Sequence, residues 1–279
     1  MTGVLISAAG LQQALAGETP VRLLDVRWEL GRSDGYLRYR TGHLPGAVYV
    51  DLDTELSAPA GAGGRHPLPS PAVFAALAQG WGINDGDLVV AYDASGGGAA
   101  ARAWWLLRHA GFADVRLLDG GLQAWQEAGG ELDTADVTAA PGNVVLSWGH
   151  MPVLDIDRAA DLARRGVLLD ARAPERYRGD TEPVDPQAGH IPGAVSLPAA
   201  GNQDDRGRYL PAGELRERFA GAGADGSKPV GTYCGSGIYA SAQVAALAHA
   251  GIEAALYPGS WSEWSSTPGR PVATGAGDR

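Results

Sequence analysis

The only cysteine of the chain, Cys234, is the residue best suited to nucleophilic chemistry. It opens the segment Cys234-Gly235-Ser236-Gly237, between an apolar run and an alanine-rich stretch. Two glycines within three residues let the backbone curl so that successive N–H groups point at one sulfur. The positive end of the following helix would face the same place, which favours a thiolate and bound anions. A small buried cysteine without a chemical role is the alternative that this loop by itself leaves open.

The spacing after Cys234 argues against phosphoryl transfer. Phosphatases with a cysteine loop need an arginine six positions after the cysteine, where it clamps a tetrahedral oxyanion through two hydrogen bonds. That position is occupied here by Ala240. The smaller loop suits the transfer of a single sulfur atom. No group of cysteines and histidines has the spacing of metal ligands, so we expect neither a metal nor an organic cofactor.

Four sequence blocks occur twice in the same order, which indicates a duplicated domain. The paired blocks are 23–27 with 168–172, 42–48 with 189–195, 88–93 with 229–234, and 118–121 with 257–260. The third pair aligns Asp93 with Cys234, so the first copy lacks a nucleophile. We therefore expect a first domain over 1–135, a linker over 136–151 and a catalytic domain over 152–279. The chemistry is expected in the second domain, and the first is expected to shape the site.

The repeated blocks carry a family resemblance. Leu-Asp-x-Arg and Gly-His-x-Pro-Gly-Ala, each present twice, with one cysteine loop in the second copy, resemble the tandem-domain rhodaneses, a family of sulfurtransferases. The resemblance covers nearly the whole chain. It implies an α/β fold of two tandem rhodanese-like domains, each an open parallel sheet flanked by helices. It also implies that Cys234 takes a sulfane sulfur from a small-molecule donor and passes the persulfide to a thiol, a thioredoxin-like protein or cyanide.

Within this family the residues of the cysteine loop separate two donor classes. Enzymes that use thiosulfate resemble Cys-Arg-Lys-Gly, and enzymes that use 3-mercaptopyruvate resemble Cys-Gly-Ser/Thr-Gly, which is the type found here. The resemblance thus assigns Gly235, Gly237, Ile238 and Tyr239 to the substrate-binding loop. The last two replace the usual Val-Thr, so a large phenol is expected at the mouth of the loop. A thiosulfate-preferring rhodanese and a low-turnover persulfide carrier or binding module remain the alternatives.

The resemblance also implies a proton relay to the serine of the loop, Ser236. In mercaptopyruvate sulfurtransferases an aspartate and a histidine of the first domain reach this serine, and Asp53 and His66 occupy the matching positions. Ser236 relayed to His66 and Asp53 would then supply a proton to the leaving pyruvate enolate. From the residues alone, His66 fits an exposed loop histidine equally well, and Asp53 fits a helix cap.

Two arginines of the second domain hold the mercaptopyruvate carboxylate in this family. Arg176 matches the first of them. The second would fall nine residues later, where the chain has Asp185, whose charge has the wrong sign. The sequence therefore predicts weaker carboxylate binding, a shift of this role to Arg178, or a different donor. Arg172 recurs in the copy that lacks the cysteine, as do the two histidines of the Gly-His blocks, so a structural role is expected for all three.

The elements that must position these residues follow from the alternation of apolar runs with helical stretches. Buried parallel strands are expected over 21–25, 88–92, 115–118, 167–170 and 230–233, and helices over 71–81, 99–110, 156–165 and 241–250. This alternation is typical of an open α/β sheet, which binds ligands beyond the carboxyl ends of its strands. Cys234 falls at such an end. A glycine-rich stretch, 61–64, predicts a flexible loop in the first copy.

Composition limits the partners and the compartment. With 279 residues, the chain can form two domains of ordinary size. A net charge of −10 and a pI near 5.0 argue against a nucleic-acid partner. Residues 1–15 have neither a basic region nor a continuous apolar run, so no signal peptide and no membrane span are expected. One cysteine without a disulfide framework favours a reducing cytoplasm.

Overall fold

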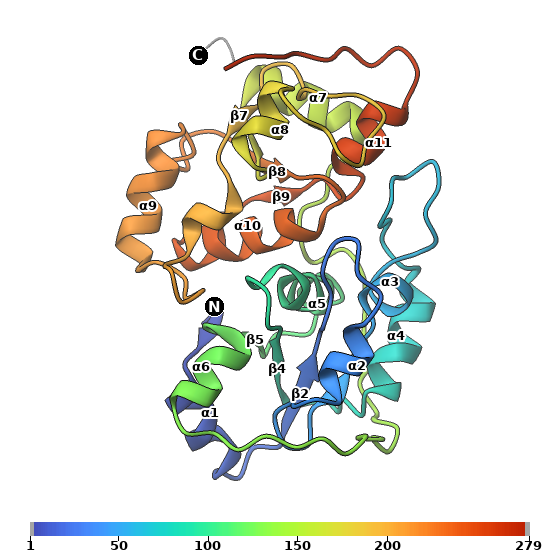
Figure 1. Ribbon diagram of the computed structural model, residues 1–279, viewed down its shortest axis with the longest axis vertical. Helices are drawn as coiled ribbons and strands as arrows, with labels where there is room; N and C mark the ends of the chain where they lie inside the picture. Colours follow the sequence, from blue (N-terminus) through green and yellow to red (C-terminus); the bar gives the residue numbers. More distant parts are fainter. Residues whose placement is uncertain (1–2, 277–279) are drawn as a thin grey trace. The chain divides into compact units, whose positions relative to one another are not determined.

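The structure, a computed structural model, describes residues 3–276 and contains two compact units (Figure 1). The first unit comprises the chain up to Ala58 together with 68–151 and 205–209. The second comprises 59–67, 152–204 and the chain from Leu210 onward. Each unit therefore holds a short segment that belongs, in sequence, to the other repeat. We call these two stretches, 59–67 and 205–209, the exchanged segments. The stretch 136–151, which we expected to be a linker, lies in the first unit.

The first unit is built on a parallel sheet with the strand order β1-β5-β4-β2-β3. Its strands are β1 (Leu5–Ile6), β2 (Val21–Asp25), β3 (Val48–Tyr49), β4 (Leu88–Tyr92) and β5 (Val115–Leu118). The central strand β4 is buried along its whole length, as its continuous apolar sequence predicts. All strands run the same way, so their carboxyl ends share one edge of the sheet.

Helices cover the sheet of the first unit. They are α1 (Ala8–Leu15), α2 (Gly35–Tyr39), α3 (Leu52–Glu55), α4 (Pro71–Gly80), α5 (Gly98–His109) and α6 (Gly121–Glu127). Figure 1 shows α1 and α6 together on one side of the strands, where Leu11 and Trp125 join the apolar core. α1 begins after Ser7, whose side chain accepts the Gly10 N–H at 3.1 Å.

The second unit repeats this plan with the strand order β7-β6-β8-β9. Its elements are α7 (Ile156–Arg165), β6 (Val167–Asp170), α8 (Pro174–Arg178), β7 (Val195–Ser196), the 3₁₀ helix η1 (Ala199–Asn202), α9 (Ala212–Gly221), β8 (Val230–Tyr233), α10 (Ile238–His249), β9 (Ala255–Leu256) and α11 (Ser260–Ser266). Aromatic side chains fill its core, among them Tyr177, Tyr233, Trp261 and Trp264. β8 leads directly into the cysteine loop.

Each unit contains an equivalent buried ion pair at the end of its strand, β2 in the first unit and β6 in the second. Arg27 contacts Asp25 and donates to the Gly42 carbonyl at 2.7 Å. Arg172 contacts Asp170 and donates to the Gly189 carbonyl at the same distance. Each arginine therefore links the end of its strand to the glycine of the Gly-His block that follows the next helix.

The histidines of the Gly-His blocks behave alike in both units. His43 stacks on Tyr39, with ring centroids 3.9 Å apart, and His190 stacks on Tyr177 at 3.7 Å. Each histidine also lies within hydrogen-bond distance of the carbonyl of its stacking partner. Burial lowers the pKa of His190, which favours the neutral ring expected of a structural histidine.

The predicted fold class, two tandem domains that each contain an open parallel sheet flanked by helices, is confirmed. All five predicted strands form with the expected bounds. The helix expected over 241–250 begins earlier, at Ile238, directly after the cysteine loop. Within residues 3–276, no helix combines the length and apolar character needed to cross a membrane.

Candidate active site

Cys234 lies at the carboxyl end of β8, in the loop that leads into α10. It is 2 % exposed, and the Gly237 N–H donates to its sulfur at a distance of 3.2 Å. Gly237 caps α10 with φ 85°, a conformation that glycine adopts without strain. A Cβ at Gly237 would also lie 2.6 Å from the Pro258 carbonyl oxygen. Glycine is therefore required where the loop folds back over the sulfur.

A serine that sequence reasoning missed supports the loop from behind. Ser260 is the only non-glycine residue with positive φ in the described chain, at 53°. Its hydroxyl accepts the Cys234 N–H at 3.1 Å and donates to the Tyr257 carbonyl at 2.9 Å. The Trp261 N–H donates to the Cys234 carbonyl at 2.9 Å. Backbone strain at Ser260 thus coincides with the contact that fixes the position of Cys234.

His66 and Ser236 are brought together in the second unit. His66 Nδ1 lies 2.7 Å from Ser236 Oγ, a hydrogen-bond distance between residues of opposite repeats. Ser236 is 5 % exposed and His66 is half-buried, so the serine hydroxyl is shielded from water. The segment 59–67, which brings His66 into the second unit, is anchored where the Arg65 N–H donates to Ser262 Oγ at 3.1 Å. His66 is therefore held by its own side chain and by the anchored backbone of its neighbour Arg65.

Asp53 lies in α3 of the first unit. Its carboxylate accepts the Trp28 Nε1–H at 3.0 Å. The helix cap that the sequence suggested for Asp53 belongs instead to Asp51, whose carboxylate accepts the Thr54 N–H at 3.0 Å. The link from Asp53 to His66 stays a prediction.

Two guanidinium groups border the cysteine loop, one of which the sequence did not single out. A Cβ at Gly235 would lie 3.1 Å from Arg65 Nη2 and 3.5 Å from Arg176 Nη1. Arg176 extends from α8, whereas Arg65 comes from the segment 59–67. In the sequence, only the position of Arg65 directly before His66 could have pointed to it. The loop that carries Cys234 thus faces two positive charges.

Two buried carboxylates hold these arginines. Arg176 contacts Glu182 at 2.6 Å and Asp185 at 3.2 Å, and Arg65 is ion-paired with Asp185. Burial raises the pKa of Asp185, although the positive charge of Arg65 opposes the shift. Burial, the largest single cause, acts in the same direction on Glu182, but the hydrogen bonds from Arg176 and from the backbone N–H groups of Asp185 and Val184, together with the charge of Arg176, lower the pKa of Glu182 overall. The cluster of two arginines and two acids is formally neutral.

The remaining predicted loop residues lie as follows. Ile238 is buried at the first turn of α10, and Tyr239 beside it is 40 % exposed. Arg178, the alternative carboxylate ligand, forms an exposed ion pair with Asp180 at 2.8 Å. Its described contacts therefore do not include the cysteine loop.

A buried cysteine in a glycine loop at the end of a central parallel strand, in one of two repeated α/β units, defines a class of protein, the rhodanese-like sulfurtransferases. The family model of the rhodanese-like domain matches residues 7–128 and 155–267. The chain therefore belongs to the rhodanese family, as the tandem repeat predicted, and is a sulfurtransferase.

Similar proteins carry the names of two donor classes. A protein of Mycobacterium tuberculosis named "Putative thiosulfate sulfurtransferase SseB" is 49 % identical, over 98 % of this chain and 97 % of its own. A protein of Pseudomonas aeruginosa named "Probable 3-mercaptopyruvate sulfurtransferase" is 44 % identical, over 97 % of this chain and 98 % of its own. The crystal structure of SseA from Escherichia coli, titled as a 3-mercaptopyruvate sulfotransferase, matches with a TM-score of 0.81 and 30 % identity over 94 % of this chain and all of that one.

Proposed function

We propose that Cys234 is the nucleophile and that 3-mercaptopyruvate is the preferred sulfur donor. The observation that carries the proposal is the cysteine loop, in which the buried Cys234 sulfur accepts the Gly237 N–H at 3.2 Å. Such a donor stabilises negative charge on the sulfur before and after transfer. The Cys234 thiolate attacks the donor's thiol sulfur, so that an S–S bond forms and the C–S bond breaks. The bonding pair leaves with pyruvate enolate, and Cys234 keeps the sulfur as a persulfide.

The enolate needs one proton at carbon to become pyruvate. Ser236 is the hydroxyl of the loop, and its Oγ lies 2.7 Å from His66 Nδ1. Ser236 supplies the proton and recovers it from His66, with Asp53 as the further member of the relay. General acid catalysis of this kind contributes ~10²–10⁴-fold in rate. In the second half-reaction an acceptor thiolate, a thioredoxin-like protein or cyanide attacks the outer sulfur and releases Cys234.

The charge of the site supports a singly charged donor. Arg65 and Arg176 are matched by Asp185 and Glu182, so the cluster beside Gly235 is formally neutral. A donor with one carboxylate adds one negative charge, whereas thiosulfate adds two. Thiosulfate remains the second candidate, because the M. tuberculosis relative bears its name and two guanidinium groups do border the loop.

Mass spectrometry after incubation with each donor tests both parts of the proposal. We expect one added sulfur atom on Cys234 after 3-mercaptopyruvate and a slower addition from thiosulfate, with a matching order of kcat/KM. Faster loading from thiosulfate would reverse the choice of donor. Absence of added sulfur from either donor would favour a binding module. The single buried cysteine supports a reducing compartment, and we propose the cytoplasm.

A further inference from the structure

Asp185 occupies the position at which the family resemblance predicts a second arginine. Its side chain is 3 % exposed and joins two guanidinium groups, those of Arg65 and Arg176. A buried carboxylate between two arginines fixes both of them in one geometry. The chain thus has an aspartate where a second arginine is expected, and Arg65 from the segment 59–67 places a guanidinium group beside that aspartate.

The backbone of the exchanged segment places Arg65 beside the loop. Gly64 has φ 97°, and a Cβ there would lie 2.7 Å from Ser262 Oγ and 2.8 Å from the Gly259 carbonyl oxygen. This close approach lets the Arg65 N–H donate to Ser262 Oγ at 3.1 Å. The guanidinium then reaches the loop, with Nη2 3.1 Å from the Cβ position of Gly235. Arg65 is fixed by its backbone at one end and by Asp185 at the other.

One donor of this guanidinium is left without a partner. Arg65 Nε is buried and makes no hydrogen bond to any described residue, whereas Asp185 engages Nη1. Buried donors are nearly always paired, so an unpaired donor on a guanidinium whose Nη2 borders the cysteine loop indicates a place for an acceptor of the substrate. Arg176 lies across the same glycine, since its Nη1 is 3.5 Å from the Gly235 Cβ position. The two guanidinium groups together can bind one planar carboxylate.

We propose that Arg65 binds the carboxylate of the donor together with Arg176, and that Asp185 is the positioning residue that holds both guanidinium groups beside the loop. The inference rests on the proposed function, since it assigns the carboxylate subsite of the same reaction. It replaces the expected second arginine of the catalytic repeat with an arginine of the other repeat. Asp185, whose charge predicted weaker carboxylate binding or a different donor, instead holds Arg65 in place for this role.

A pair of donors that differ only in the carboxylate tests this assignment. Steady-state kinetics with 3-mercaptopyruvate and with its uncharged analogue 1-mercapto-2-propanone are compared for Arg65→Met, Arg65→Lys and the unmodified protein. We expect Arg65→Met to raise KM for 3-mercaptopyruvate on the order of 10–100-fold with little change in kcat, the mark of lost ground-state binding. The analogue should be used as before. Arg65→Lys should recover part of the loss, because it keeps the charge but not the two-bond geometry.

The control is Arg208→Met, which removes the arginine that follows Gly207 in the other exchanged segment and should leave both donors unaffected. Asp185→Asn should raise KM for 3-mercaptopyruvate as well, since the arginines lose their common anchor. Unchanged KM in Arg65→Met, or equal losses with both donors, would overturn the assignment, because Arg65 would then act only by placing His66. If the unmodified protein takes no sulfur from 3-mercaptopyruvate, the proposed donor fails first, and the carboxylate subsite fails with it.

Discussion

The loops after β4 and β8 are built alike but use their N–H groups differently. Each loop ends in a glycine with positive φ that caps the next helix, Gly97 at 76° and Gly237 at 85°. In the first unit the buried Asp93 carboxylate accepts N–H groups of three residues of its own loop and helix, at 2.9–3.1 Å. In the second unit the Gly237 N–H points at the Cys234 sulfur. The first loop is an anion site filled by its own side chain, whereas the second leaves its N–H donor to a reactive sulfur.

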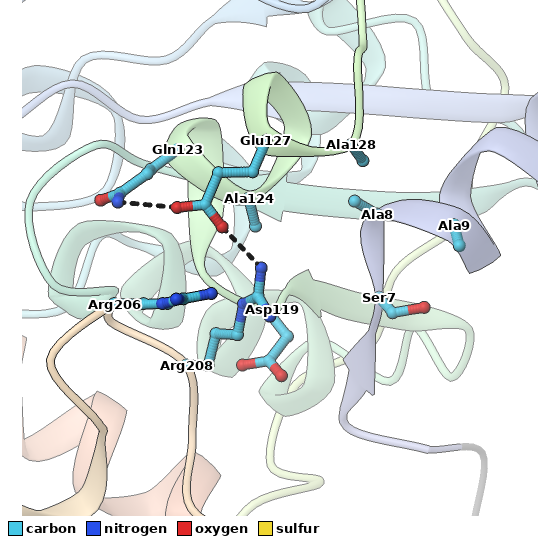
Figure 2. Close-up of a pocket in the computed structure, with 10 residues that line it drawn as sticks. All are labelled: Ser7, Ala8, Ala9, Asp119, Gln123, Ala124, Glu127, Ala128, Arg206 and Arg208. Carbon is cyan, nitrogen blue, oxygen red and sulfur yellow. Dashed lines mark hydrogen bonds and ion pairs between the residues drawn. The ribbon is translucent and has the colours of Figure 1, made fainter.

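The two exchanged segments extend this comparison. Gly64-Arg65-His66 lies in the second unit, and Gly207-Arg208-Tyr209 lies in the first, with both glycines at positive φ. Arg208 pairs with Glu127 at 2.8 Å beside a cavity of about 680 Å³, and Figure 2 shows Glu127 between Gln123 and Arg208. Arg65 pairs with Asp185 beside a nucleophile. A glycine with positive φ thus precedes an arginine in both segments, and this arginine borders the cysteine loop only in the second unit.

Replacing Cys234, the residue that distinguishes the second loop from the first, should have the largest effect. We expect Cys234→Ser to reduce sulfur transfer to background, a loss on the order of 10³-fold or more, because only a thiolate can hold the transferred sulfur. The matched change, Asp93→Ala, leaves buried N–H groups unpaired and should cost about 1–3 kcal/mol of stability with little loss of transfer. Turnover assays and thermal denaturation measure the two effects. Measurable turnover by Cys234→Ser with any donor would refute the nucleophile.

The proton relay should give the next largest effect. Replacing His66 or Ser236 by Ala should each lower turnover of 3-mercaptopyruvate about 10²-fold, and the double variant should be little worse, because the residues act in series. Thiosulfate turnover should suffer less, since sulfite leaves without a proton. Ser95→Ala is the control in the first loop, where the serine hydroxyl donates to the Trp28 carbonyl instead. Full mercaptopyruvate activity in His66→Ala would remove the relay.

Much of this comparison was predictable from the sequence, because the determining signals are local or repeated. Buried parallel strands are continuous apolar runs, so β2, β4, β5, β6 and β8 were predicted with their bounds. The two-residue strands β1, β3, β7 and β9 are too short to have a period. The loop at Cys234 was predictable from its glycines. That the loop after β4 lacks a nucleophile was predictable from Asp93, which aligns with Cys234.

The exchanged segments and the supporting serine were not predictable. Arg65 contacts Ser262, which lies 197 positions away, and the contact depends on the close approach at Gly64. Asp185 was interpreted from its charge alone, and the arginine that it holds comes from the other repeat. The positive φ of Ser260 has no sequence signal, since serine rarely adopts it. Tertiary contacts between distant segments set each of these features.

Ser260 in the second unit aligns with Gly121 in the first. Replacing Ser260 by alanine and by glycine separates the effect of backbone strain from that of the lost hydrogen bond. Both have positive φ, 53° and 56°. Ser260→Ala should destabilise the second unit by about 1–3 kcal/mol, because the buried Cys234 N–H loses its acceptor while the strain stays. Ser260→Gly loses the same acceptor but relieves the strain, so it should recover about 1 kcal/mol. Denaturant unfolding of both variants checks the order. Equal stabilities would mean that the backbone at Ser260 is unstrained.

The smallest expected effect concerns Glu182, the buried acid that pairs with Arg176 in the second unit. Burial raises the pKa of Glu182, but the hydrogen bonds from Arg176 and two backbone N–H groups, together with the charge of Arg176, lower it below its ordinary value of 4.5 overall. Its stabilising contribution is therefore fully present above about pH 4.5 and is lost as the pH falls through the lower, folded-state pKa. Glu182→Gln has no carboxyl group to titrate. We expect it to unfold at a lower temperature than the unmodified protein at pH 7, and to lose less stability on acidification to pH 3.

Glu127→Gln in the first unit is the matched control, because the ion pair of Glu127 with Arg208 is partly exposed and such pairs contribute little. Its melting temperature should stay close to that of the unmodified protein at pH 7. Thermal denaturation at pH 7 and pH 3 measures all three proteins. If Glu182→Gln and the unmodified protein lose stability in parallel on acidification, the ionised form of Glu182 does not stabilise the fold. The difference between the units would then rest on Asp185 and the cysteine loop, with Glu182 contributing shape but not charge.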